Sequence, residues 1–158
     1  VEELKGVLEI PIGFHGHNNL HAAVANSLAA VNAGCQSIDG CARGYGAGAG
    51  NMSLEAFAAI LEKDGVKTGL DIKELTSLAK LIEDRFETTL PKVDSISTAT
   101  GYYGIFSGFK PKILDAAAAC DIEPMDLIER LGELQVIAGQ EDQIIATASN
   151  IAMEIQKQ

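Results

Sequence analysis

The chain has 158 residues, of which 47% are hydrophobic and 22% charged, a composition that suits a globular protein and argues against disorder. Its formal net charge of −10 argues against a surface for nucleic acid or an acidic membrane, because binding phosphate requires clustered lysines and arginines and the twelve here are scattered. No apolar run approaches the roughly 20 residues of a membrane-spanning helix, so small molecules and protein partners remain as ligands.

The cysteines and the amino terminus indicate the cellular compartment. Cys35, Cys41 and Cys120 are odd in number and lack Cys-x-x-Cys spacing, which argues against a disulfide framework or a thiolate zinc site. The first residues do not resemble a secretory signal, and the chain begins with Val1 instead of Met. We therefore expect a cytoplasmic protein and a fragment of a longer one.

The first part of the chain alternates between strand and helix patterns. Apolar residues recur at helical spacing from Leu20 to Val31, and Gly34 is expected to end that helix. A second stripe begins at Leu54, and Gly65 is expected to end its helix. A loop rich in glycine, residues 40–50, precedes the second of these helices. The expected elements are strands over residues 7–17 and 35–39 and helices over residues 20–33 and 54–64. This βαβα order is typical of a parallel sheet or barrel.

From Asp71 onward the pattern is helical. Asp71 followed by Glu74 resembles a capping box, and an apolar stripe then continues to Phe86 before Pro91. Further helices are expected over residues 111–120, 124–131 and 140–155. We therefore predict two domains, residues 1–67 with two βα units and residues 68–158 with helices alone. Two parallel strands would leave open faces and edges, so an upstream segment or another chain is expected to cover them.

His15 and His17 form the most informative pair of side chains. Residues two apart on a strand point to the same side, and these histidines come where the first strand enters its helix. In α/β barrels this end of the strands carries the active site, and a His-x-His pair there can hold a cation. The alternative is a packed or surface pair. His21, one turn later, is either a supporting group of this site or a solvated residue, and Asn18 or Asn19 is expected to cap the helix.

Residues 40–51 contain many glycines but match neither a phosphate loop nor a dinucleotide fingerprint. Repeated glycines let backbone approach a ligand closely, so Asn51 is either a metal neighbour or a helix cap. Asp39 ends the second strand at the same rim as the histidines, where it either supports the site or fixes the loop. Cys41 has no adjacent base that would make it a nucleophile.

Four separated motifs, in this order, make the whole chain resemble the 4-hydroxy-2-oxovalerate aldolase family. They are residues 13–20 (GFHGHNNL), 38–40 (IDG), 46–51 (GAGAGN) and 139–142 (GQED). The resemblance implies an α/β fold with the last two βα units of a (β/α)8 TIM barrel, followed by an all-helical carboxy-terminal domain that communicates with an acylating acetaldehyde dehydrogenase. It also implies that His15 and His17 bind a divalent ion, and that an Asp ligand, an Arg and a His base belong to a first barrel strand that this chain lacks.

The implied reaction is cleavage of 4-hydroxy-2-oxovalerate to pyruvate and acetaldehyde, a step of aromatic hydrocarbon catabolism. Two imidazoles, one carboxylate and several oxygens suit octahedral manganese, magnesium or cobalt better than tetrahedral zinc, and we expect manganese. Phe106 departs from the family, which has a tyrosine there that reaches the active site, and phenylalanine cannot donate a hydrogen bond. The alternatives are an acyl-CoA lyase or synthase relative and a non-catalytic docking module or subunit of a split barrel.

Overall fold

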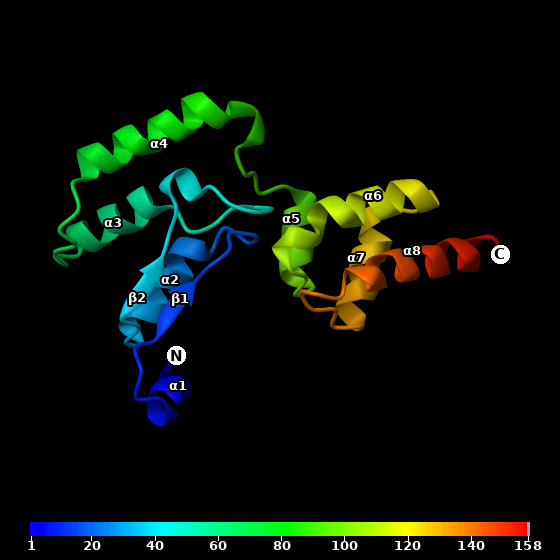
Figure 1. Cartoon of the computed structure of the whole chain (residues 1–158), viewed down its shortest axis with the longest axis horizontal. Coiled ribbons are helices and arrows are strands. Elements are labelled where there is room, and N and C mark those ends of the chain that lie inside the picture. The colour runs from blue at the N-terminus through cyan, green and yellow to red at the C-terminus, as the bar shows by residue number, and fades with distance from the viewer. Residues whose placement is uncertain (158) are drawn as a thin grey trace. The chain divides into compact units, whose positions relative to one another are not determined.

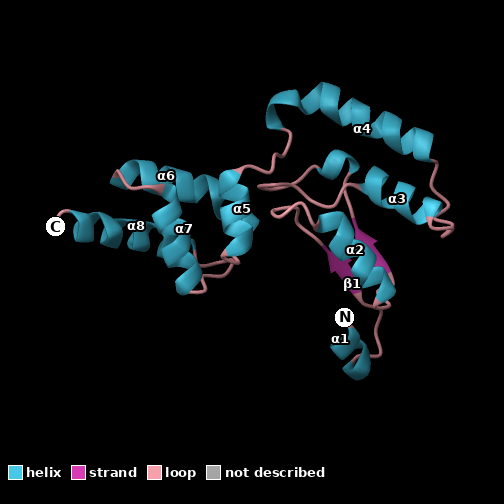
Figure 2. Ribbon diagram, turned by 180° about the vertical axis from the view of Figure 1, so that it is seen from behind, coloured by secondary structure: helices cyan, strands magenta, loops and turns pink. Residues whose placement is uncertain are grey.

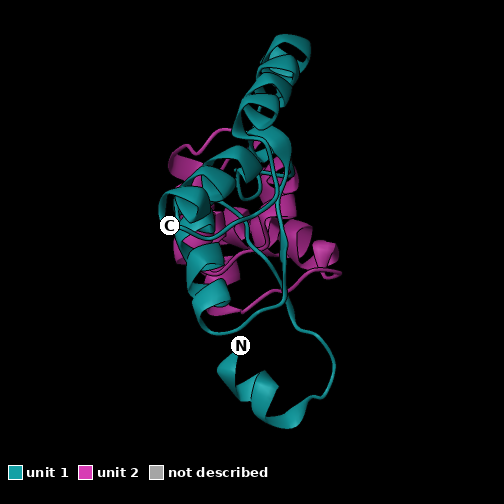
Figure 3. Cartoon of the chain, turned by 90° about the vertical axis from the view of Figure 1, so that its left-hand side faces the viewer, with its two compact units in different colours: residues 1–91 teal, residues 92–158 magenta. Residues whose placement is uncertain are grey.

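The computed structural model describes residues 1–157, which form two compact units (Figure 1, Figure 3). Unit 1 comprises residues 1–91 and unit 2 residues 92–158. Unit 1 contains helices, 3-10 turns (η) and two strands: α1 (Glu2–Val7), β1 (Gly13–His15), α2 (Ala23–Asn32), β2 (Ser37–Asp39), η1 (Ala42–Gly44), α3 (Leu54–Lys63), α4 (Ile72–Phe86) and η2 (Glu87–Thr89). Unit 2 is entirely helical in the part that the structure describes: α5 (Ser95–Tyr102), η3 (Ser107–Phe109), α6 (Lys110–Cys120), α7 (Pro124–Glu133) and α8 (Glu141–Ile155).

β1 and β2 form a parallel two-stranded sheet (Figure 2). Their register pairs Gly13 with Ser37, Phe14 with Ile38 and His15 with Asp39. The prediction of a strand over residues 7–17 was too long, because residues 2–7 form helix α1 and only three residues of β1 pair with β2. Among the described residues each strand pairs only with the other, so a residue counts as strand only where β1 and β2 are hydrogen-bonded to each other, and both strands are short.

Helix α2 begins later than predicted, at Ala23 instead of Leu20. His21 has φ of 57°, in the left-handed region, which breaks helical geometry before the first turn. The N-cap position of α2 is Ala22, not Asn18 or Asn19 as predicted. The Asn18 carboxamide oxygen nevertheless accepts a hydrogen bond from the Ala23 N–H at 3.2 Å. At the other end Gly34 has φ of 89°, as the predicted glycine stop requires.

Helix α4 belongs to unit 1, whereas the predicted domain boundary placed it with the helical domain. It packs against α3 and η1, and the two compact units divide after Pro91. Its beginning is as predicted, since the Asp71 carboxylate accepts hydrogen bonds from the N–H groups of Lys73 and Glu74. The cause of the later division is side-chain packing between distant segments, which local periodicity does not report.

Unit 2 has one continuous core at the junction of its helices. The cluster includes Phe109, Ile113, Leu127, Leu131 and Ile144, each at most 1% exposed. Helices α6, α7 and α8 lie within two residues of the predicted bounds. Helix α5 was not predicted, because its sequence SISTATGY lacks an apolar stripe, and it is defined instead by the capping side chain of Asp94.

The predicted class is confirmed in a coarse form, as a mostly helical α/β protein with a small parallel sheet. None of the helices within residues 1–157 is both long and apolar enough to cross a membrane.

Candidate metal-ligand site

His15 and His17 lie together at the carboxyl end of β1. Their ring centroids are 5.0 Å apart and the ring planes meet at 76°. His15 is the last residue of β1, and His17 lies two residues beyond it, in an isolated bridge with Asn51. His15 is exposed and His17 is partly buried. The pair therefore presents two imidazoles close together, one at the end of β1 and one just beyond it.

Asp39 lies beside His15 because of the strand register. The two residues are paired across the sheet, and the His15 Nδ1 is 3.5 Å from an Asp39 carboxylate oxygen. Both side chains are well exposed, at 45% and 68%. A carboxylate near one imidazole nitrogen orients the ring and leaves the other nitrogen for a ligand, which is a common arrangement around metal-binding histidines.

The surroundings of His17 favour a neutral imidazole. Burial lowers the pKa of His17 below its usual value, and the nearby His15 lowers it further, while a hydrogen bond involving the Gly50 backbone opposes both effects. A neutral imidazole has a free electron pair on one ring nitrogen, which is the form that binds metal ions.

The backbone around His17 is held by the end of the glycine loop. The Asn18 N–H donates to the Gly50 carbonyl at 2.9 Å, and the Met52 N–H donates to the Gly16 carbonyl at 3.0 Å. These bonds flank an antiparallel bridge between His17 and Asn51. The loop thus fixes the backbone of one candidate ligand.

The Asn51 side chain forms hydrogen bonds with other residues of the glycine loop. Its side-chain amide donates to the Tyr45 carbonyl at 3.2 Å and to the Cys41 sulfur at 3.3 Å. Among the described residues, the buried Oδ1 of Asn51 has no hydrogen-bond partner. Sequence reasoning had selected Asn51 but not Gly46, where an added Cβ would lie 2.4 Å from the Asn51 amide nitrogen. The repeated glycines of this loop were the sequence signal that could have identified Gly46. They indicate that the backbone approaches another group closely, but not which group.

The other predicted residues have surroundings of their own. His21 is exposed on the left-handed turn before α2. Cys41 is partly buried, with its sulfur against Asn51. Phe106 belongs to unit 2, where its ring packs edge-on against Phe109 at a centroid distance of 5.4 Å.

The two imidazoles fit part of a catalytic metal centre. Within residues 1–157 no group of three or more His, Cys, Asp or Glu side chains is arranged to hold a metal ion. Catalytic sites commonly use two or three protein ligands and keep positions open for substrate and water.

Known proteins match both parts of the chain. The HMGL-like family matches residues 1–82, and a DmpG-like communication domain matches residues 91–153. Proteins named 4-hydroxy-2-oxovalerate aldolase from Streptomyces tendae and Serratia proteamaculans are 47% and 44% identical over 89% and 91% of this chain. The matches cover 40% and 43% of those proteins, so the chain spans about two-fifths of their length.

A solved structure resembles the fold. It is the N-terminal domain of a Bacteroides vulgatus protein assigned as an aldolase, with a TM-score of 0.65 and 26% identity, covering 72% of this chain and 38% of that one. These matches confirm the resemblance drawn from the four motifs. Because its first 82 residues, just over half of its length, match that family, the chain belongs to the HMGL-like family.

Proposed function

We propose that this chain carries the carboxy-terminal part of a divalent-metal-dependent 4-hydroxy-2-oxovalerate aldolase of the cytoplasm, with the last two βα units of its barrel. The observation that supports the proposal most is the His15–His17 pair at the end of β1, in a chain whose relatives carry that name. The remaining strands of the barrel and its first-strand Asp, Arg and His would come from a segment outside this chain.

In the proposed site His15 and His17 hold the divalent ion, with manganese preferred over magnesium or cobalt. When bound, the ion supplies Lewis-acid chemistry toward the keto and carboxylate oxygens of the oxoacid. Asp39 orients the His15 ring, and the loop contacts of residues 50–52 keep the His17 backbone in place. Asn51 stands beside His17 as a supporting residue of the same site.

The proposed reaction is a retro-aldol cleavage, which requires no oxidant or reductant. A base removes the proton of the 4-hydroxyl group, the bond between C3 and C4 breaks, and acetaldehyde leaves. The electron pair of that bond remains on the pyruvate portion and is protonated at C3. The resemblance assigns that base to a histidine of the first barrel strand, outside this chain, so the chain alone is expected to be inactive.

Unit 2 is proposed to dock an acylating acetaldehyde dehydrogenase, which would oxidise the aldehyde product. The support is the match of residues 91–153 to a communication domain. A second candidate is a non-catalytic docking subunit of a split barrel, favoured by Phe106 at the tyrosine position and by the incomplete ligand set among the described residues. An acyl-CoA lyase or synthase is less well supported, because the relatives share the aldolase name.

The decisive experiment measures pyruvate release from 4-hydroxy-2-oxovalerate, coupled to lactate dehydrogenase, in the protein that contains the whole barrel. We expect manganese-dependent activity, and a fall of more than about tenfold in metal affinity for His15→Ala and for His17→Ala. The matched control is His21→Asn, because asparagine tolerates the left-handed backbone at that position. Unchanged manganese affinity in the His15→Ala protein would refute the ligand assignment. Pyruvate release by the 158-residue chain alone would refute the need for further segments.

A further inference from the structure

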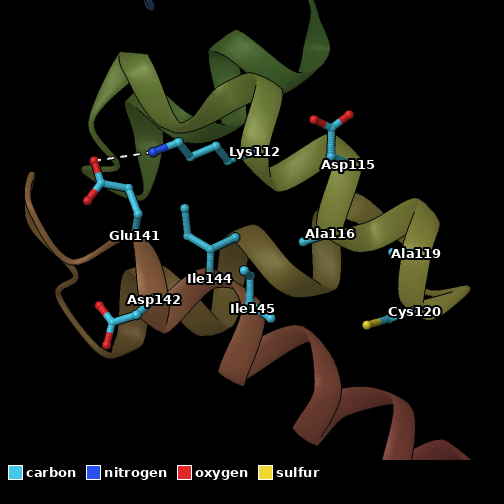
Figure 4. A pocket seen from close by; sticks show the side chains of 9 residues that line it. All are labelled: Lys112, Asp115, Ala116, Ala119, Cys120, Glu141, Asp142, Ile144 and Ile145. Atoms are coloured by element: carbon cyan, nitrogen blue, oxygen red, sulfur yellow. Dashed lines mark ion pairs between the residues drawn. The ribbon is translucent and has the colours of Figure 1, made fainter.

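Unit 2 contains an apolar hollow between α6 and α8 that the proposed chemistry does not use. Its volume is about 520 Å³, and alanines of α6 and isoleucines of α8 line it (Figure 4). Figure 4 shows Ala116 and Ala119 on one wall and Ile144 and Ile145 on the other. We call this hollow the α6–α8 groove.

The floor of the groove suits an aliphatic side chain of another molecule. Ile144 is fully buried and forms the base, whereas Ile145 on the next position is 66% exposed although it is large and apolar. Ala116 and Ala119 are small, so a second helix could approach the backbone of α6 closely. The exposed Ile145 and the hollow beside it form one apolar surface between α6 and α8.

The rim of the groove is acidic. Asp115, Glu141 and Asp142 surround it together with a single cation, Lys112. The Lys112 Nζ lies 3.4 Å from Oε1 of Glu141. The carboxylates of Asp115 and Asp142 therefore have no ion-pair partner in the part of the chain that the structure describes. The rim therefore favours a ligand that brings positive charge.

The same charges decide among the candidate occupants. A second copy of this chain carries a formal charge of −10 and would place one acidic rim against another. An acidic membrane surface is repelled for the same reason. A segment with aliphatic residues on one face and Lys or Arg at its flanks matches both the floor and the rim.

We propose that the α6–α8 groove binds a basic amphipathic helix of a partner protein, with one or two aliphatic side chains on the floor and cations against Asp115 and Asp142. This inference rests on the proposed docking role of unit 2 and names the recognition chemistry of that partner. The match of both helices to a communication domain supports a protein as the occupant.

The test uses the full 158-residue chain and three synthetic 18-residue peptides. The first is a helix with a leucine stripe flanked by lysines, the second has the same stripe flanked by glutamates, and the third is a scramble of the first with no stripe. Binding is measured by fluorescence anisotropy and by isoleucine methyl NMR, with Ile144 and Ile145 as reporters and Ile60 and Ile82 of unit 1 as internal controls. We expect the lysine peptide to bind at least about tenfold more tightly than the other two and to shift only the reporters.

Variants separate groove binding from general attraction to an acidic chain. Ala119→Phe fills the groove and is expected to reduce affinity about tenfold or more, whereas Ala118→Phe alters an exposed alanine of the same helix that does not line it. The double change Asp115→Asn and Asp142→Asn should weaken binding more than Glu2→Gln with Glu3→Gln, which changes the net charge equally. This second pair keeps the test valid if Ala119→Phe does not fold.

Equal affinity for the lysine and glutamate peptides, or equal effects of Ala119→Phe and Ala118→Phe, would overturn the proposal. Self-association of the chain that Ala119→Phe abolishes would assign the groove to a second copy and would overturn it as well. Neither result depends on pyruvate release, so the aldolase assignment is tested separately.

Discussion

Gly46 shows how a single residue without a side chain supports the candidate site. An added Cβ at this position would lie 2.4, 2.6 and 2.8 Å from the amide nitrogen, carbon and oxygen of Asn51. Asn51 is itself bridged to His17 through the backbone. The glycine therefore leaves room for the asparagine that fixes the backbone of a proposed metal ligand.

We expect Gly46→Ala to lower manganese affinity of the assembled protein by about tenfold, because Asn51 must move and the His17 backbone moves with it. Isothermal titration with manganese measures this change. Gly6→Ala is the matched control, since nothing lies within 4 Å of a Cβ at that helical position. Equal affinity of the Gly46→Ala and Gly6→Ala proteins would show that the loop does not position the ligand.

Phe106 is the residue that we predict to stand where the aldolase family has a tyrosine. It is 43% exposed and lies at the start of η3, against Phe109. Two hypotheses compete, a lost proton donor and a pocket adapted to a more apolar aldehyde. They predict opposite effects of restoring the hydroxyl group.

If the rest of the site is complete, Phe106→Tyr is expected to raise kcat, because a positioned proton donor contributes about 10²-fold or more when protonation limits the rate. The measurement is pyruvate release with acetaldehyde and longer aldehydes as products. Tyr102→Phe is the control, since that tyrosine is 77% exposed and the resemblance places the family tyrosine at Phe106 instead. A fall in kcat for every substrate would reject the lost-donor hypothesis.

At the scale of elements, α5 illustrates a helix defined by its cap. The Asp94 carboxylate accepts hydrogen bonds from the Ser97 N–H at 2.9 Å and from Lys110 at 2.6 Å. Burial by itself raises the pKa of Asp94, but the bonds from Lys110 and Ser97 outweigh it and hold the pKa at about 2, below the usual 3.8. The ionised carboxylate therefore joins the start of α5 to the start of α6.

Because the folded pKa is depressed, this contribution is present above about pH 4 and is lost as the pH falls toward 2. We expect Asp94→Ala to lower the free energy of unfolding at pH 7 by about 0.5–2 kcal/mol, the usual value of a helix cap. Asp94→Asn keeps a capping oxygen and loses the charge, so it should retain part of the stability and titrate less between pH 4 and 2. Urea denaturation at pH 7 and pH 3 tests both. Identical pH dependence in wild type and Asp94→Asn would contradict this assignment.

At the scale of the whole molecule, the two units differ in how much apolar surface they bury. The core of unit 2 contains 13 buried residues, whereas the cluster around α2 and α3 in unit 1 contains Ala23, Met52 and Phe57. Unit 1 also relies on a sheet of two strands. A two-stranded sheet with so small a core is not expected to make unit 1 stable by itself.

We therefore expect residues 92–158, expressed alone, to unfold cooperatively and residues 1–91 alone to show no cooperative transition. Circular dichroism during thermal denaturation measures both. Within unit 2, Leu131→Ala removes a fully buried side chain and should cost about 2–5 kcal/mol, whereas Leu134→Ala alters a side chain that is 55% exposed and should cost far less. A cooperative transition in residues 1–91 would show that the sheet and its helices are stable without further strands.

The sequence alone determined the features that depend on local spacing. His15 and His17 are two residues apart and their rings lie close together, and helices end at Gly34 and Gly65 because the backbone there requires positive φ. The Asp71 cap is also local, since it bonds to N–H groups two and three residues away. Such features need no knowledge of the fold, and they were predicted correctly.

Only the tertiary structure decided what lies beside these features. The register of β1 and β2 brings Asp39 to His15, and the return of the glycine loop brings Asn51 to His17. The packing of α4 on α3 likewise assigned that helix to unit 1, and the meeting of α6 with α8 formed the groove. These neighbours are tens of residues apart in most cases, and their contacts depend on how whole elements pack, which the period of a single element does not encode.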